Sequence, residues 1–217
     1  MTRAVGIDLA ARALHLVAVD VDPRSARVAT AAIMRPDDAD ALAAACADAS
    51  AVAVDAPAEP STAPHLGDAN VSRKFRTGRC GEIALGEQHR CWVPWVTPRA
   101  GDDTPGWMRV GFRVWLDLRA AGHGPLEVFP AGAFRLLGGV RLPKKSSPAG
   151  RRARLDLLDR EVTLPDDVGT WGHDLIDACM AALVAAWSVS GGRAVAAAHD
   201  HEGTDRSAIW VPRPSDE

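Results

Sequence analysis

Acidic residues end two short apolar segments in the first quarter of the chain. Asp8 follows the apolar residues 4–7, and Asp55 follows the apolar residues 51–54. Aspartate is depleted from strands, and burying an isolated carboxylate costs free energy unless a cation or hydrogen bonds compensate its charge. Backbone hydrogen bonds at a strand end would satisfy either residue alone. Because the same arrangement occurs twice, a shared metal ion is the preferred interpretation.

A second acidic pair opens the long apolar segment 173–189. Asp174 and Asp177 are three residues apart, so both carboxylates lie on one face if the segment is helical. The alternative role for the pair is to cap the helix and interact with its dipole. With Asp8 and Asp55 the pair supplies four carboxylates, which suit Mg²⁺ or Mn²⁺ because these ions prefer oxygen ligands. Two such ions can clamp the reacting oxygens of a phosphodiester, so the predicted chemistry is hydrolysis.

Basic residues that could contact substrate phosphates form two clusters. Arginine grips phosphate bidentately and lysine acts as a point charge, and the alternative for every one of these residues is solvated surface. The predicted phosphate contacts are Arg73, Arg76, Arg79, Lys144, Lys145 and Arg151. Glu127, in the short apolar segment 126–130, is either a further metal ligand or a salt-bridge partner for an arginine of the segment 57–105.

The elements that must position the acids follow the order strand, strand, strand, helix, strand. The connections at 11–12 and 22–25 are short enough for hairpin turns, so the first three strands form a meander. If the fourth strand lies beside the first, Asp8 and Asp55 become neighbours. The predicted elements are strands over 4–9, 13–20 and 26–34, a helix over 37–48 and a strand over 51–55.

The segment 57–105 is rich in proline, glycine and polar residues. It is too long for an ordinary connection, which predicts a functional insertion, such as a lid that faces the substrate. The pattern then predicts helices over 107–121, 131–137, 148–160 and 173–189, a strand over 126–130 and two short strands within 191–211. We therefore expect a single α/β domain over 1–217, with a mixed five-stranded sheet, flanking helices and the insertion between strands 4 and 5.

Length, composition and charge limit the classes of protein to which the chain can belong. The chain has 217 residues, of which 47% are hydrophobic, so it can bury a substantial core. A formal net charge of -3 argues against a surface uniformly adapted to nucleic acid, but a local basic patch can still bind a charged substrate. No apolar run reaches membrane-spanning length, the N-terminus lacks a signal-like core, and the four cysteines show no paired spacing. We expect a cytoplasmic protein without disulfides and without a membrane partner.

The order of these motifs resembles the domain of unknown function 429 family. The motifs are Gly6-Ile7-Asp8, Val54-Asp55-Ala56-Pro57, Glu127-Val128-Phe129-Pro130, the basic stretch 144–152, His173-Asp174-Leu175-Ile176-Asp177-Ala178 and Ile209-Trp210-Val211-Pro212. The resemblance implies a ribonuclease H-like fold, in which the first and fourth strands are adjacent, and a predicted nuclease activity. It also implies an acidic set like that of Holliday-junction resolvases, formed by Asp8, Asp55 and the pair Asp174 and Asp177.

Three classes of function follow from these observations. The first is a metal-dependent nuclease or phosphodiesterase, an enzyme with Mg²⁺ or Mn²⁺ as cofactor and DNA or RNA as partner. The second is a non-catalytic nucleic-acid or protein binding module of the same fold. The third, an ATP-handling phosphotransferase, is disfavoured because it needs two such domains and glycine-rich phosphate hairpins, and this chain has room for one domain. The sequence carries no indication of an oligomeric state.

Overall fold

A seven-stranded mixed sheet forms the centre of the fold. The computed structural model describes residues 1–139, 141–199, 205 and 207–213. The strand order is β3-β2-β1-β4-β5-β7-β6. β1, β4, β5 and β7 run parallel to one another, and the hairpins β1–β2, β2–β3 and β6–β7 are antiparallel. The strands are β1 (Thr2–Ala10), β2 (Ala13–Val21), β3 (Ala26–Met34), β4 (Ala51–Asp55), β5 (Leu126–Val128), β6 (Ala194–Ala197) and β7 (Ile209–Pro212).

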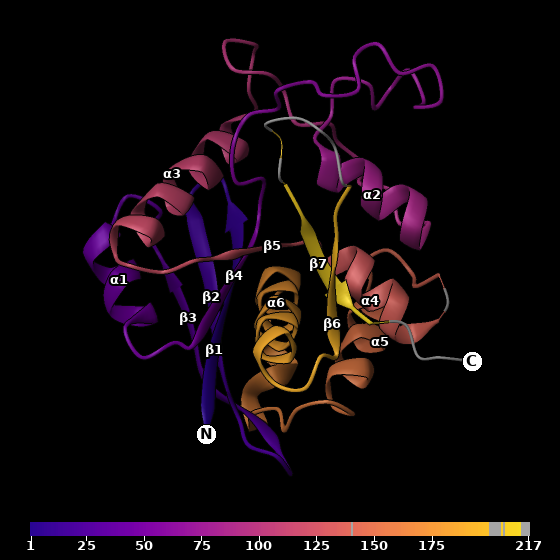
Figure 1. The fold of residues 1–217 in the computed structure, drawn as a ribbon. Coiled ribbons are helices and arrows are strands. Elements are labelled where there is room, and N and C mark those ends of the chain that lie inside the picture. The colour runs from indigo at the N-terminus through magenta and orange to yellow at the C-terminus, as the bar shows by residue number, and fades with distance from the viewer. Residues whose placement is uncertain (140, 200–204, 206, 214–217) are drawn as a thin grey trace.

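Helices cover both faces of the sheet (Figure 1). α1 and α3 pack on one face through a cluster that includes Leu42, Trp115 and Leu118, while α6 packs on the other face. The described helices are α1 (Ala39–Cys46), α2 (Cys80–His89), α3 (Gly106–Ala120), α4 (Pro130–Gly138), α5 (Pro148–Leu158) and α6 (His173–Val189), with a short 3-10 helix at Asp166–Thr170. None of the helices in the described ranges is long and apolar enough to cross a membrane.

The order of elements in the first quarter of the chain agrees with the prediction, and β1 lies beside β4. The prediction of five strands was wrong, because β7 pairs with the edge of β5 and brings β6 with it into the same sheet. The strand predicted over 126–130 is shorter, since Pro130 is the first residue of α4 and cannot continue a β ladder.

The insertion between β4 and β5 contains a helix that the sequence pattern did not predict. α2 is buried along most of its length and has no apolar face of its own, so the 3.6-residue periodicity that reveals a surface helix is missing. Its residues Ile83 and Leu85 pack with Phe75 from the same insertion and with Ile209 and Val211 of β7. This part of the insertion is therefore packed on the sheet, although its loops lie at the end of the molecule opposite the N-terminus (Figure 1).

Gly6 allows α6 to lie unusually close to β1. A Cβ atom at Gly6 would lie 2.1 Å from the carbonyl oxygen of Ala178 and 2.2 Å from the amide nitrogen of Ala182. Residues 4, 6 and 8 share one face of β1 because side chains alternate along a strand. Asp8 therefore points to the same helix, near its N-terminal turns.

Replacing Gly6 should be strongly destabilising. In Gly6→Ala the new methyl group meets helix backbone, which can give way only if α6 moves as a unit, so we expect the free energy of unfolding to fall by about 3 kcal/mol, the upper end of the usual range for overpacking. The matched control is Gly169→Ala, where a Cβ atom has nothing within 4 Å. Urea denaturation of both variants measures the difference, and equal stability of the two would contradict the close packing.

Candidate metal centre

The register of the sheet places three side chains of the candidate site on one face. Asp8 pairs with Asp55 across the parallel β1–β4 ladder and with His15 across the antiparallel β1–β2 hairpin. Directly paired residues point to the same side of a sheet. This is the side that α6 covers, because the neighbouring positions Ala53 and Val17 belong to the cluster packed around α6.

The N-terminal turns of α6 bring two more carboxylates to this face. Ligand atoms of Asp8, Asp55 and Asp177 all lie within 4.8 Å of one another. A second group, formed by Asp8, His15 and Asp174, meets the same limit. Asp8 belongs to both groups, so all four predicted carboxylates converge around one side chain. Asp8 and Asp177 are buried, and Asp55 and Asp174 are half-buried.

Burial and mutual repulsion disfavour full ionisation of the buried acids. Burial raises the pKa of Asp8, and the charges of Asp55 and Asp177 raise it further. Burial and the charge of Asp177 also raise the pKa of Asp55, although a hydrogen bond with Asp8 opposes that shift. Burial raises the pKa of Asp177 as well, against the influence of Lys145. Like charges held this close share protons unless a cation neutralises them.

Lys145 supplies part of that neutralisation. Its Nζ donates to Oδ2 of Asp177 at 2.7 Å. Burial opposes the charge of Lys145, but Asp177, Asp8 and Asp55 outweigh burial and raise its pKa. Among the described residues Lys145 is the cation that contacts Asp177, and the charge of Arg154 also lowers the pKa of Asp177.

The residues present fit a divalent ion. Oδ1 of Asp177 is buried and has no hydrogen-bond partner among the described residues. A buried carboxylate oxygen without a partner is costly, and a metal ion would satisfy it. The donor set is dominated by carboxylate oxygens from rigid elements, as Mg²⁺ and Mn²⁺ require. The acidic cluster can therefore hold such an ion.

His15 is a site residue that the sequence reasoning missed. It lies within β2, where a lone histidine gives no motif. The hairpin could have revealed it: the two-residue turn at 11–12 fixes the register of the hairpin, and this register puts residue 15 opposite residue 8. Burial lowers the pKa of His15, while Asp174 partly opposes the shift.

Glu127 does not lie in this centre. Its partner across the β4–β5 ladder is Val54, not Asp55, so its side chain is on the face opposite the acids. There Glu127 accepts hydrogen bonds from both terminal nitrogens of Arg79, including one at 2.7 Å, and from the amide of Ala58 at 3.2 Å. The salt-bridge interpretation of Glu127 therefore agrees with the structure, and the metal-ligand interpretation does not.

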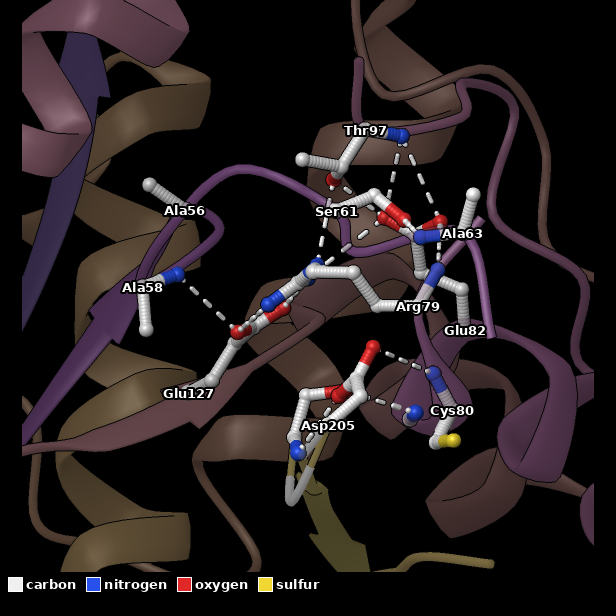
Figure 2. A network of polar contacts seen from close by, with 12 residues as sticks. Ala56, Ala58, Ser61, Ala63, Arg79, Cys80, Glu82, Thr97, Glu127 and Asp205 are labelled. Atoms are coloured by element: carbon white, nitrogen blue, oxygen red, sulfur yellow. Dashed lines mark hydrogen bonds and ion pairs between the residues drawn. The ribbon is translucent and has the colours of Figure 1, made fainter. Parts of the chain in front are cut away.

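Arg79 is the centre of this second buried network (Figure 2). Figure 2 shows its side chain extended between Glu127 on one side and Glu82 and Thr97 on the other. Arg79 is 1% exposed, so the expectation of a phosphate contact was wrong: its guanidinium is enclosed and already paired with two carboxylates.

The other predicted phosphate contacts are more accessible. Arg73, Lys144 and Arg151 are exposed, although one nitrogen of Arg151 donates to the carbonyl of Trp171 at 3.3 Å. Arg76 is half-buried and donates to the carbonyl oxygens of Val71 and Ala69. Of the six basic residues, Lys145 is the one that the structure brings into contact with the acidic centre.

Removing the charge of Asp8 should stabilise the metal-free protein at neutral and alkaline pH. Because the folded-state pKa of Asp8 is raised, the folded protein keeps a proton that the unfolded chain releases above about pH 4, so stability falls as pH rises through this window. In chelator near pH ~8 we expect Asp8→Asn to be more stable by at least about 1 kcal/mol, or ~2–4 °C in Tm. The gain should vanish near pH ~4. A variant less stable than wild type at both pH values would contradict the electrostatic reading.

Breaking the Arg79 network should be destabilising without any ligand present. Arg79→Met leaves Glu127 and Glu82 buried without their cation, which typically costs about 3–5 kcal/mol. The matched control is Arg73→Met, an exposed arginine of the same insertion, with an expected change within about 0.5 kcal/mol. Chemical denaturation of both variants tests whether Arg79 is structural.

The chain matches one protein-family model over part of its length and is distantly similar to solved structures. T. thermophilus RuvC in complex with a Holliday junction substrate is similar at 16% identity and a TM-score of 0.47, over 88% of this chain and 97% of that one. A second structure of Thermus thermophilus RuvC is similar at 14% identity and a TM-score of 0.44, over 84% and 91%. No curated protein sequence matches the chain. A model of the family described as "Protein of unknown function (DUF429)" matches residues 113–202, in agreement with the family resemblance of the motifs.

Proposed function

We propose that the protein is a metal-dependent phosphodiesterase that acts on nucleic acid. The observation that carries this proposal is the convergence of Asp8, Asp55 and Asp177, from β1, β4 and α6, where an oxygen of Asp177 has no hydrogen-bond partner within the described ranges. The adjacent first and fourth strands support a ribonuclease H-like fold, as the family resemblance implies. An ion held there would activate water and stabilise charge on the phosphate.

Each acid has a distinct part in holding the centre. Asp8 is shared by both ligand groups, so it fixes the position of the centre on the sheet. Asp55 lies opposite Asp8 across the β1–β4 ladder. Asp177 approaches from α6, where its hydrogen bond to Lys145 fixes the orientation of its carboxylate. Because these side chains come from two paired strands and a closely packed helix, little reorganisation is needed when a cation enters.

Basic residues beside the acids would position the substrate. Ser147 caps α5 and binds the backbone of Lys144, and the backbone of Gly150 lies against the same carbonyl. This tight segment precedes α5 and contains Lys145, which contacts Asp177; Lys144 is its exposed neighbour in the chain, and Arg151 is exposed in the first turns of α5. We propose that these side chains bind the phosphates of a nucleic acid, with Arg73 as a further contact and with the loops of the segment 57–105, outside α2, as a lid over the bound strand.

The test is a cleavage assay with labelled substrates and Mn²⁺. Branched DNA, single-stranded DNA, RNA and hybrid duplex are compared, and chelator should abolish cleavage of whichever is cut. Asp8→Asn and Asp177→Asn should lower the rate by roughly 100-fold or more, because each removes a direct ligand. Asp167→Asn, an exposed acid of the 3-10 helix, is the matched control and should cleave at the wild-type rate.

Thermal stability separates the proposal from the alternatives. Saturating Mn²⁺ should raise the Tm of the wild type but not that of Asp8→Asn. Stabilisation by metal and nucleic acid without any cleavage would favour a binding module. Stabilisation by ATP but not by DNA or RNA would favour a phosphotransferase.

A further inference from the structure

His15 makes the second ligand group chemically different from the first. The group of Asp8, Asp55 and Asp177 offers oxygen atoms only, whereas the group of Asp8, His15 and Asp174 offers one imidazole nitrogen. The imidazole is largely enclosed, with a side-chain exposure of 13%. Its position is fixed by the β1–β2 register directly opposite Asp8.

No hydrogen bond from the described residues explains why the imidazole of His15 lies among these acids. Nδ1 is buried and has no hydrogen-bond partner in the described part of the chain. Nε2 lies 3.9 Å from Oδ2 of Asp174, which is too far for a hydrogen bond. Two ligand atoms of one ion, each bonded at about 2.1 Å, lie at most about 4.2 Å apart. The separation between His15 and Asp174 falls within that limit.

His173 is the neighbouring histidine that could play the same part, and its geometry is less suitable. Its Nδ1 contacts Oδ1 of Asp174 directly, and its side chain is 41% exposed. It belongs to neither of the two ligand groups found among the described residues. His15 is therefore the better nitrogen donor.

We propose that His15, Asp8 and Asp174 form a second metal position that selects a transition metal such as Mn²⁺ over Mg²⁺. Imidazole nitrogen is a good ligand for transition metals, while Mg²⁺ binds mainly carboxylates, phosphates and water. The all-oxygen position accepts either ion. This inference rests on the metal centre of the proposed function, but it needs no substrate and no turnover.

Electron paramagnetic resonance of the Mn²⁺-loaded protein tests the inference directly. Electron spin-echo modulation should show coupling of Mn²⁺ to a histidine nitrogen in the wild type. The coupling should be lost in His15→Gln and retained in the matched control His173→Gln. Titration should find two bound Mn²⁺ ions in the wild type and one in His15→Gln, and the preference for Mn²⁺ over Mg²⁺ should fall by roughly tenfold or more.

The outcomes separate this inference from the proposed function. Absence of nitrogen coupling in the wild type, or its loss in His173→Gln with retention in His15→Gln, overturns the role of His15 even if nucleic acid is cleaved. Nitrogen coupling from His15 without cleavage of any substrate supports the metal position and overturns the nuclease proposal. If His15→Gln fails to fold, the wild type and His173→Gln decide the question: absence of coupling in the wild type, or its loss in His173→Gln, overturns the role of His15, and coupling retained in His173→Gln supports it.

Discussion

The structure depends on holding several carboxylates against one another between a strand and a helix. Asp8 of β1 faces Asp177 of α6 because Gly6 lets the helix backbone approach the strand within the space of a missing methyl group. This close packing of α6 on β1 also shields the acids from water. Burial raises the pKa of Asp8 and strengthens the repulsion between the carboxylates. The packing that stabilises the core thus also places carboxylates close enough to repel one another, and a divalent cation would relieve this repulsion.

The molecule contains two buried charged clusters on opposite faces of the sheet, and they are balanced differently. Arg79 satisfies Glu127 and Glu82 at once, with Thr97 completing the hydrogen bonds, so that cluster fastens the insertion to β5 (Figure 2). At the acidic centre Lys145 contacts Asp177, and Oδ1 of Asp177 has no hydrogen-bond partner among the residues that the structure describes. The first cluster pairs its buried charges with one another, whereas the second could bind a divalent ion.

A shift of one residue separates the two clusters. Asp55 pairs with Asp8, while Glu127 pairs with Val54, the residue before Asp55, and so points to the other face. The sequence showed an acid in each of these apolar segments and left Glu127 open as either a metal ligand or a salt-bridge partner. Pairing register is set by the whole sheet, so it cannot be inferred from the composition of either strand alone. The same applies to Arg79, which looks like any other arginine of a basic stretch until its burial is known.

The amino-acid sequence by itself determined the meander, the helix and strand that follow it, and the acidic positions 8, 55, 174 and 177, because strand alternation and helical periodicity are local properties. Tertiary structure decided which neighbours those acids have. It placed His15 and Lys145 at the acidic centre and Glu127 and Arg79 in a separate buried network, and it extended the sheet to seven strands. The reason is that charge balance around a buried group depends on contacts between segments distant in the chain, and no local pattern encodes them.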